Sequence, residues 1–230
     1  KILSQAAEEV LSVERHWLSR LQVALAQFPA TDEDRAVLDR SVRQLDELFL
    51  LVVVGEFNSG KSALINALFG ESLLEMGVTP TTTRVHLLRY GQRLERVAIE
   101  ADVDVFSVPA AMLEEITIVD TPGTNAIFRE HEAMTRDFVP RSDLVLFVTS
   151  VDRPFTESER AFLELIREWG KKIVVVLNKI DILEDPAELD AIERFVKENV
   201  QTLLGFVPEV LPVSARLALR AKQAQDSALL

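Results

Sequence analysis

The sequence predicts an α/β domain: a mostly parallel central sheet with helices on both faces, preceded by further helices. Two observations lead to this prediction. Short apolar runs of strand length alternate with longer segments in which apolar residues recur every three to four positions. A glycine-rich segment at residues 55–62 joins the first apolar run directly to a helical pattern. Strands that alternate with helices form parallel sheets, because each crossover helix packs on a face of the sheet.

The composition fits a globular domain and excludes some classes of site. The chain has 230 residues, enough for one domain with a sizeable core, and 48% of them are hydrophobic. It contains no cysteine, which excludes disulfides and thiolate metal sites and is typical of a reducing compartment. The net charge of −12 disfavours contact with polyanions, so we expect no nucleic-acid partner. No apolar run approaches the roughly 18 residues that a membrane span needs.

Residues 1–48 predict two helices ahead of the sheet. Pro29 ends the first helix, and Thr31 followed by Asp32 would cap the second. The two helices either cover an edge of the domain or form the stub of a bundle whose partner helices lie in chain absent here. Because the chain begins with Lys1 and stops inside a helical pattern, we expect it to be a piece of a larger protein.

The strand pattern begins with residues 49–54, which run into the glycine-rich segment. Residues 84–90 and 96–101 predict two strands joined through Gly91, as a hairpin. Residues 102–115 are poorly patterned and predict a short helix at most. Later strands are predicted at residues 116–119, 144–148, 172–177 and 210–213.

Two later helices have clear start signals. Thr156 and Glu159 form a capping box for a helix that Gly170 ends. Asp185 caps the next helix, whose first position is Pro186. A last helix follows residue 216. The helices therefore fall between the predicted strands, as the fold class requires.

The glycine-rich segment reads G-E-F-N-S-G-K-S and matches the phosphate-binding pattern G-x-x-x-x-G-K-S. A strand before it and a helix after it are the context that such a loop requires. Its glycines let successive N–H groups and the helix N-terminus point at phosphates. Lys61 would reach the β- and γ-phosphates, and the Ser62 hydroxyl would ligate Mg²⁺. The predicted nucleotide contacts in this loop are Gly55, Phe57, Asn58, Ser59, Gly60, Lys61, Ser62 and Ala63.

Two further loops predict the γ-phosphate end of a nucleotide site. Asp120 begins a D-T-P-G sequence at the end of an apolar strand, so its carboxylate would hold Mg²⁺ through water, and the Gly123 N–H would contact the γ-phosphate. We expect Thr82 to close onto Mg²⁺ and to position the attacking water. Thr81 and Thr83 remain alternatives for that role.

The sequence N-K-I-D at residues 178–181 predicts the base. The Asp181 carboxylate can accept from both the ring N–H and the exocyclic amino group of guanine, whereas adenine presents a lone pair to it. Such a mismatch can discriminate by roughly 10⁴. Lys179 would lie along the base, and Asn178 would brace the phosphate loop. Ser214, Ala215 and Arg216 would complete the pocket, with the Ala215 N–H donating to the guanine carbonyl.

These five loops, in this order, resemble the motif set of a P-loop GTPase. More narrowly, G-E-F-N-S-G-K-S, G-V-T-P-T-T and V-D-T-P-G-T-N-A resemble the dynamin-like large GTPases, in the group of bacterial dynamin-like proteins, mitofusins and plastid fuzzy-onion-like proteins. The resemblance implies a GTPase domain at residues 49–216, a helical neck segment at residues 1–48 and the start of a second neck helix at residues 217–230. It also implies a homodimer across the nucleotide face and a role in membrane remodelling or fusion. Lipid would be contacted through parts absent from this chain, so the expected location is cytoplasmic or organelle-interior, peripheral to a membrane.

The chain departs from related GTPases at the catalytic loops. Thr124 follows the D-T-P-G sequence, so the glutamine that orients water in Ras-like enzymes is missing there. Phe57 and Asn58 stand where eukaryotic dynamins carry glutamine and serine. We expect the Asn58 amide to stabilise transition-state charge and Phe57 to shield the site. Alternative sources of positive charge are Arg129, Arg136, Arg141 and Arg153.

Two other functions share these motifs. An Era-like switch in translation or ribosome assembly should carry a basic RNA-binding extension, which the net charge of −12 disfavours. A septin-like assembly protein would bind GTP with negligible turnover. GTP hydrolysis by a dynamin-like enzyme, with Mg²⁺ as cofactor and GDP as product, is the leading hypothesis.

Overall fold

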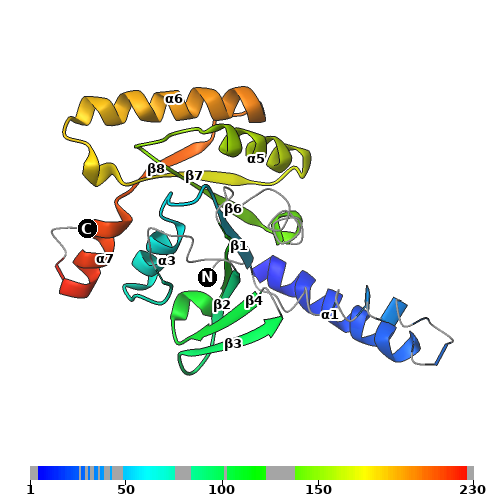
Figure 1. Ribbon diagram of the computed structural model, residues 1–230. Helices are drawn as coiled ribbons and strands as arrows, with labels where there is room; N and C mark the ends of the chain where they lie inside the picture. The colour runs from blue at the N-terminus through cyan, green and yellow to red at the C-terminus, as the bar shows by residue number, and fades with distance from the viewer. Residues whose placement is uncertain are drawn as a thin grey trace.

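A single mixed sheet organises the chain in the computed structural model, which describes residues 5–25, 27–28, 31, 34–35, 37–38, 42, 49–75, 84–100, 103–122 and 138–226 (Figure 1). Within these residues, eight strands follow the order β3-β4-β2-β5-β1-β6-β7-β8. Parallel pairs join β5, β1, β6, β7 and β8, and also β2 with β4. Among the described strands, only β2–β5 and β3–β4 pair antiparallel. The predicted α/β class is therefore confirmed. The strands are β1 Phe49–Val54, β2 Val85–Tyr90, β3 Glu95–Glu100, β4 Val103–Val108, β5 Ile116–Asp120, β6 Leu144–Ser150, β7 Ile173–Asn178 and β8 Glu209–Pro212.

Helices cover both faces of this sheet (Figure 1). On one face α5 and α6 pack on the strands, and on the other α3 and α7 pack together and on the strands. Short 3₁₀ turns at Ala111–Glu114, Val139–Arg141 and Ile180–Ile182 complete the described connections. The helices are α1 Gln5–Leu25, α3 Lys61–Phe69, α5 Glu157–Glu168, α6 Pro186–Leu204 and α7 Ala215–Ala224.

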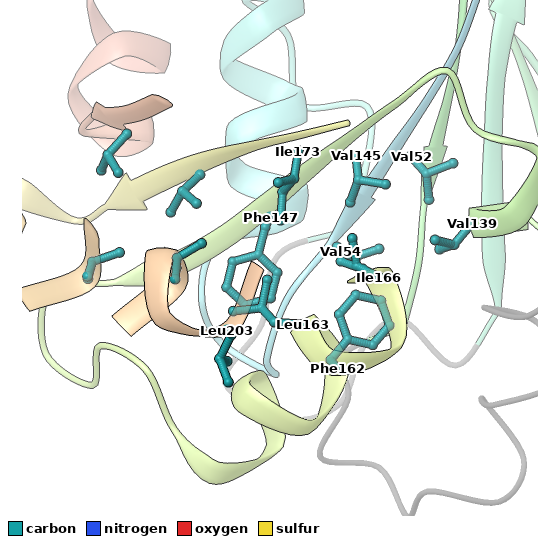
Figure 2. Packing of buried hydrophobic residues seen from close by; sticks show 14 of the residues in the cluster. Val52, Val54, Val139, Val145, Phe147, Phe162, Leu163, Ile166, Ile173 and Leu203 are labelled. Atoms are coloured by element: carbon teal, nitrogen blue, oxygen red, sulfur yellow. The ribbon is translucent and has the colours of Figure 1, made fainter. Parts of the chain in front are cut away.

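The central strand β1 is buried on both faces, which explains its continuous apolar sequence. Val52 and Val54 point into the core under α5 and α6, where Phe147 and Phe162 stack at 6.4 Å (Figure 2). Val53, between them in sequence, belongs to the second core under α3 and α7. Because side chains alternate along a strand, β1 anchors both cores and holds the loop that follows it.

The outer part of the sheet differs from the prediction. Residues 84–90 and 96–101 do not form a hairpin, because β4 lies between β2 and β3, parallel to the first and antiparallel to the second. Strand β4 lies within residues 102–115, for which we predicted no strand. Asp104, a charged residue at a position 1% exposed, interrupts the apolar pattern and hides the strand. The short helix expected in this segment is present at residues 111–114.

The predicted boundaries of α5 and α6 agree with the structure. Thr156 and Glu159 form the capping box of α5, and the Asp185 side chain accepts from the Ala187 N–H at 2.8 Å to cap α6. Gly170 and Gly205 follow these helices with positive φ, the conformation that a helix C-terminus favours in glycine.

Helix α1 confirms the first of the two predicted N-terminal helices, and it extends away from the sheet (Figure 1). Its Val10, Val13 and Trp17 side chains are more than half exposed. The Thr31 hydroxyl accepts from the Asp34 N–H at 3.1 Å, at the predicted start of the second helix. None of the helices in the described part of the chain combines the length and the apolar character that crossing a membrane requires. Assignment of residues 1–48 to a neck stays a prediction.

Helix α7 packs on α3, where the Lys222 ammonium donates to the Leu68 carbonyl at 2.9 Å. Leu219 and Ala221 on its inner face are buried. The described part of α7 is thus in contact with the sheet domain. The assignment of residues 217–230 to a neck helix also stays a prediction.

Candidate functional site

The predicted motif residues follow the carboxyl ends of parallel strands, which meet at one edge of the sheet. Gly55 follows β1, Thr121 follows β5, Lys179 follows β7 and Ser214 follows β8 closely. Open α/β sheets bind ligands at this edge. The parallel register therefore collects motifs that are more than 100 residues apart in the sequence.

The phosphate loop wraps around the Lys61 side chain. The Lys61 ammonium donates to the Gly55 and Glu56 carbonyls, each at 3.0 Å. Burial lowers the pKa of Lys61, and the nearby carboxylates of Asp120, Glu159 and Glu56 oppose that effect. A cation held inside a loop at a helix N-terminus is the arrangement that receives phosphate oxygens.

Asn58 lies at the exposed turn of this loop with a φ of 63°. Asparagine tolerates this left-handed conformation better than other side chains that carry a Cβ. Phe57 before it is half-buried. The roles that we predicted for Asn58 and Phe57 stay predictions.

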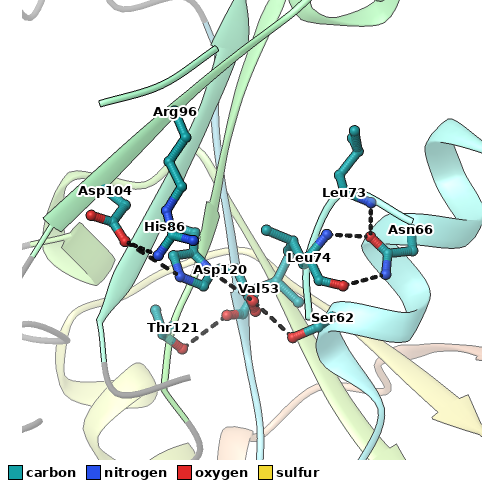
Figure 3. Close-up of polar contacts among 10 residues, drawn as sticks. All are labelled: Val53, Ser62, Asn66, Leu73, Leu74, His86, Arg96, Asp104, Asp120 and Thr121. Atoms are coloured by element: carbon teal, nitrogen blue, oxygen red, sulfur yellow. Dashed lines mark hydrogen bonds and ion pairs between the residues drawn. The ribbon is translucent and has the colours of Figure 1, made fainter. Parts of the chain in front are cut away.

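Ser62 and Asp120 meet beside the loop (Figure 3). The Ser62 hydroxyl donates to Asp120 Oδ2 at 3.0 Å, and the Thr121 hydroxyl donates to the Val53 carbonyl at 2.9 Å. Asp120 is fully buried, and its Oδ1 has no hydrogen-bond partner among the described residues. A hydroxyl and a carboxylate with a spare buried oxygen are ligands that Mg²⁺ prefers, so this pair fits the predicted metal.

The other residues predicted for the γ-phosphate end, Thr82 with its alternatives and Gly123, lie outside the described residues, as do Arg129 and Arg136. Of the remaining arginines, Arg153 is exposed just after β6, at the carboxyl edge. Arg141 precedes β6 and therefore lies at the opposite edge of the sheet. This position removes Arg141 as a source of charge at the site of its own chain.

Asn178 at the end of β7 joins the phosphate loop to the predicted base pocket. Its amide nitrogen donates to the Ser59 carbonyl at 3.0 Å and more weakly to the Gly60 carbonyl at 3.4 Å. This is the contact with the phosphate loop that we predicted. Its amide oxygen accepts from the Ala215 N–H at 3.1 Å. That N–H, which we predicted to donate to guanine, is thus committed to Asn178 in this structure.

The Asp181 carboxylate is fixed from both sides. Ser214 Oγ donates to Asp181 Oδ1 at 2.5 Å, and the Arg216 guanidinium pairs with Oδ2 at 2.5 Å. The Asp181 side chain is only 6% exposed. Lys179, with a φ of 66°, pairs with Asp152 at 3.2 Å. Asp181, Lys179, Ser214 and Arg216 were predicted for the pocket, but the ion pair by which Arg216 orients Asp181 was not.

Helix α5 contacts the phosphate loop through Ser158 and carries the buried Glu159 next to it, neither of which the motifs revealed. The Ser158 hydroxyl donates to Glu56 Oε1 at 3.0 Å, tying α5 to the loop. Glu159 is 1% exposed and accepts from the Thr149 hydroxyl at 3.1 Å and the Thr156 N–H at 3.0 Å. Burial raises the pKa of Glu159 to about 7 against the effect of these hydrogen bonds. The capping box located Glu159, but only the tertiary fold buries it.

We expect the free energy of unfolding of the Glu159→Gln variant at pH 8 to exceed that of the wild type by up to about 3 kcal/mol. Its folded pKa of about 7 lies above the ordinary 4.5, so the folded state holds a proton that the unfolded state releases. The stability contributed by this proton is fully present below pH 4.5 and is lost as the pH rises to about 7. Urea unfolding at pH 5 and pH 8 measures the effect. A variant with the pH dependence of the wild type would contradict it.

Comparison with known proteins places this geometry in a family. The family described as "50S ribosome-binding GTPase" matches residues 50–179, more than half of the chain. The "Probable transmembrane GTPase FZO-like, chloroplastic" of Arabidopsis thaliana is 48% identical over 196 residues, which cover 83% of this chain and 22% of that protein. "Dynamin-like protein 2" of Campylobacter jejuni is 29% identical, covering 79% of this chain and 33% of its own length.

A solved structure agrees in fold. A member of an "oligomerised bacterial dynamin pair" superposes with a TM-score of 0.68 at 18% identity, covering 100% of this chain and 42% of that one. The chain thus spans between about a fifth and less than half of the length of these three proteins. The resemblance to dynamin-like GTPases predicted from the motifs is confirmed by these relatives. The chain is a GTPase domain and belongs to the 50S ribosome-binding GTPase family.

Proposed function

We propose that this domain binds GTP and hydrolyses it by attack of water on the γ-phosphate. One observation carries the proposal: a contiguous polar arrangement links the metal-ligand pair, the phosphate loop and the base pocket. Ser62, which bonds to Asp120, follows Lys61 at the start of α3, and Asn178 bonds the same loop to the segment that holds Asp181. Along one edge of the sheet, the metal ion, the phosphates and the base would each meet one of these groups.

In this proposal the loop N–H groups and Lys61 bind the β- and γ-phosphates. The two hydrogen bonds that Lys61 makes to loop carbonyls would be exchanged for stronger, charge-assisted bonds to phosphate oxygens. Mg²⁺ bound by Ser62, Thr82 and, through water, Asp120 would neutralise charge on the phosphates. Thr82 and the Gly123 N–H would position the attacking water and the γ-phosphate. Fixed donors of this kind stabilise charge without reorganisation during the reaction.

The base pocket is proposed to select guanine. Asp181 would accept from the two N–H groups of guanine, in the orientation that Ser214 and Arg216 impose. Lys179 would cover one side of the base. Burial of the carboxylate strengthens the penalty for a base that cannot donate to it.

We also propose that GTP drives dimerisation across the nucleotide face and that the full-length protein couples this to membrane remodelling or fusion. The support lies in the relatives: one is named a transmembrane GTPase, and the solved bacterial pair is described as sensing and tethering membranes. Lipid contact would come from parts of the protein beyond this chain.

A second candidate is a ribosome-associated switch, because the description of the matching family names the 50S ribosome. The domain would then change its affinity for the ribosome between its GTP and GDP states. The net charge of −12 weighs against direct contact with RNA by this segment. We therefore rank it below the dynamin-like function.

The deciding experiment measures GTP turnover per molecule against protein concentration, with light scattering in GDP, GTP and a GDP–aluminium fluoride mimic. We expect a rate that climbs with concentration and dimers that form in the mimic. A flat rate that 50S subunits accelerate would support the ribosomal switch instead. Bound nucleotide without turnover would contradict both and favour a septin-like assembly protein.

The Asn58→Gly variant is expected to lose about 100-fold in the rate of hydrolysis while its GDP affinity changes less than tenfold. Glycine adopts the φ of 63° freely, so the variant removes the amide without straining the loop. Single-turnover hydrolysis and GDP titration separate the two effects. Asn58→Asp, with the same shape but a negative charge, should be at least as slow. A wild-type rate in Asn58→Gly would exclude the amide from catalysis.

A further inference from the structure

His86 lies buried in the middle of the sheet, between two carboxylates. It stands in β2, directly opposite Asp120 of β5 on one side and Asp104 of β4 on the other. His86 Nδ1 is 3.8 Å from Asp120 Oδ2, and His86 Nε2 is 4.0 Å from Asp104 Oδ2 (Figure 3). The three side chains thus share one face of three adjacent strands.

Two arginines hold the outer end of this row. The Arg96 guanidinium of β3 bonds to Asp104 Oδ2 at 2.7 Å, and the Arg84 guanidinium lies 3.3 Å from Oδ1. Arg96 also lies over the Phe106 ring, at 5.4 Å from its centre. A buried carboxylate needs such partners, because an unpaired charge in the interior is costly. Asp104 is therefore firmly placed beside the imidazole.

Packing alone does not account for a histidine here. The His86 side chain is 10% exposed, and its ring meets Phe106 edge-on at 5.2 Å, a contact that an apolar ring would make equally well. His86 Nδ1 has no hydrogen-bond partner within the described residues, and a buried polar atom without a partner destabilises the fold. The nitrogen faces Asp120, whose Oδ1 also lacks a hydrogen-bond partner among the described residues.

We propose that His86 is a positioning residue that sets the orientation of Asp120 for Mg²⁺. The proposal rests on the proposed function, which assigns Asp120 to the metal. Groups behind a metal ligand fix its direction, and removing them typically lowers metal affinity by 10- to 100-fold. Through Asp104 the same row reaches Arg84, two residues after Thr82 in the sequence. The outer strands β4 and β3 thereby support the metal end of the site.

The test compares His86→Phe with His86→Asn, which keeps an amide near the position of Nδ1. The affinity for a fluorescent GDP is measured while Mg²⁺ is titrated, and the readout is the Mg²⁺ concentration at the midpoint of the change in affinity. The affinity without metal is measured separately in EDTA. We expect His86→Phe to require 10- to 100-fold more Mg²⁺, with its affinity in EDTA unchanged. His86→Asn should recover most of the loss. His16→Phe, at an exposed position of α1, serves as the control and should match the wild type.

An unchanged Mg²⁺ requirement in His86→Phe would overturn the proposal, as would equal losses in the phenylalanine and asparagine variants. If thermal melting shows that His86→Phe is unfolded, His86→Asn and Asp104→Asn decide. If Asp104→Asn requires more Mg²⁺ while His86→Asn stays near the wild type, the result supports the proposal that His86 and Asp104 together position Asp120. An unchanged Mg²⁺ requirement in Asp104→Asn contradicts it. A wild-type domain that binds no guanine nucleotide would instead refute the proposed function.

Discussion

Gly60→Ala is expected to lower the affinity for guanine nucleotide by at least about 100-fold. Gly60 has a φ of 92°, and a Cβ at this position would lie 2.2 Å from the Asn178 amide nitrogen. Either the phosphate loop or Asn178 has to move by about 1 Å, and a displacement of that size in a binding site typically costs about two orders of magnitude. The substitution therefore separates the phosphate loop from the base pocket. Calorimetric titration with GDP measures the loss.

Gly170→Ala is the matched control. Gly170 also has a positive φ, 62°, but nothing lies within 4 Å of a Cβ built there. We expect this variant to lose about 1 kcal/mol of folding stability, the cost of the left-handed backbone, and no nucleotide affinity. Equal GDP affinities in the two variants would show that the contact between Gly60 and Asn178 does not matter for binding.

Asp181→Asn is expected to reduce the preference for guanine over xanthine nucleotides by roughly 10⁴. The asparagine amide cannot accept from both N–H groups of guanine, whereas it can donate to the carbonyl that xanthine carries in place of the amino group. Arg216 would also lose the charge that it pairs with at 2.5 Å. Competition between GTP and xanthosine triphosphate for a fluorescent GDP measures the change.

Asp152→Asn controls for the loss of a nearby charge. Asp152 pairs with Lys179, but its side chain is 41% exposed, and solvent weakens such pairs. We expect less than a tenfold change in affinity and no change in base preference. If Asp181→Asn keeps the wild-type preference for guanine, the assignment of Asp181 to the base is wrong.

The sequence was sufficient to predict those elements whose signals lie within a few neighbouring residues. The capping box of Thr156 and Glu159, the Asp185 cap and the apolar run of β1 each depend on residues within a few positions of one another, and each is where the pattern places it. The motif residues at the ends of β1, β5 and β7 also follow from strand-to-loop order alone. Local patterning thus gave the fold class and the edge of the sheet that carries the site.

Features that depend on pairing between distant segments could not be predicted from the sequence. The insertion of β4 between β2 and β3 brings Asp104 beside His86, and no periodicity within residues 102–115 indicates that neighbour. The bond between Asn178 and the Ala215 N–H likewise joins residues 37 apart, across the parallel pairing of β7 with β8. The Asp104 carboxylate can be buried because Arg84 and Arg96 pair with it. A strand that contains such a charged residue cannot be recognised from a pattern of apolar residues.

The carboxyl group of Glu159, next to the phosphate loop, couples nucleotide binding to proton binding. Because burial raises its pKa to about 7, this carboxyl group is partly protonated at neutral pH. A nucleotide adds several negative charges near Lys61, which interacts electrostatically with Glu159, and added negative charge raises the pKa of a carboxyl group. We therefore expect GTP binding at neutral pH to take up a fraction of a proton, so that the observed heat depends on the ionisation enthalpy of the buffer and the affinity depends on the pH.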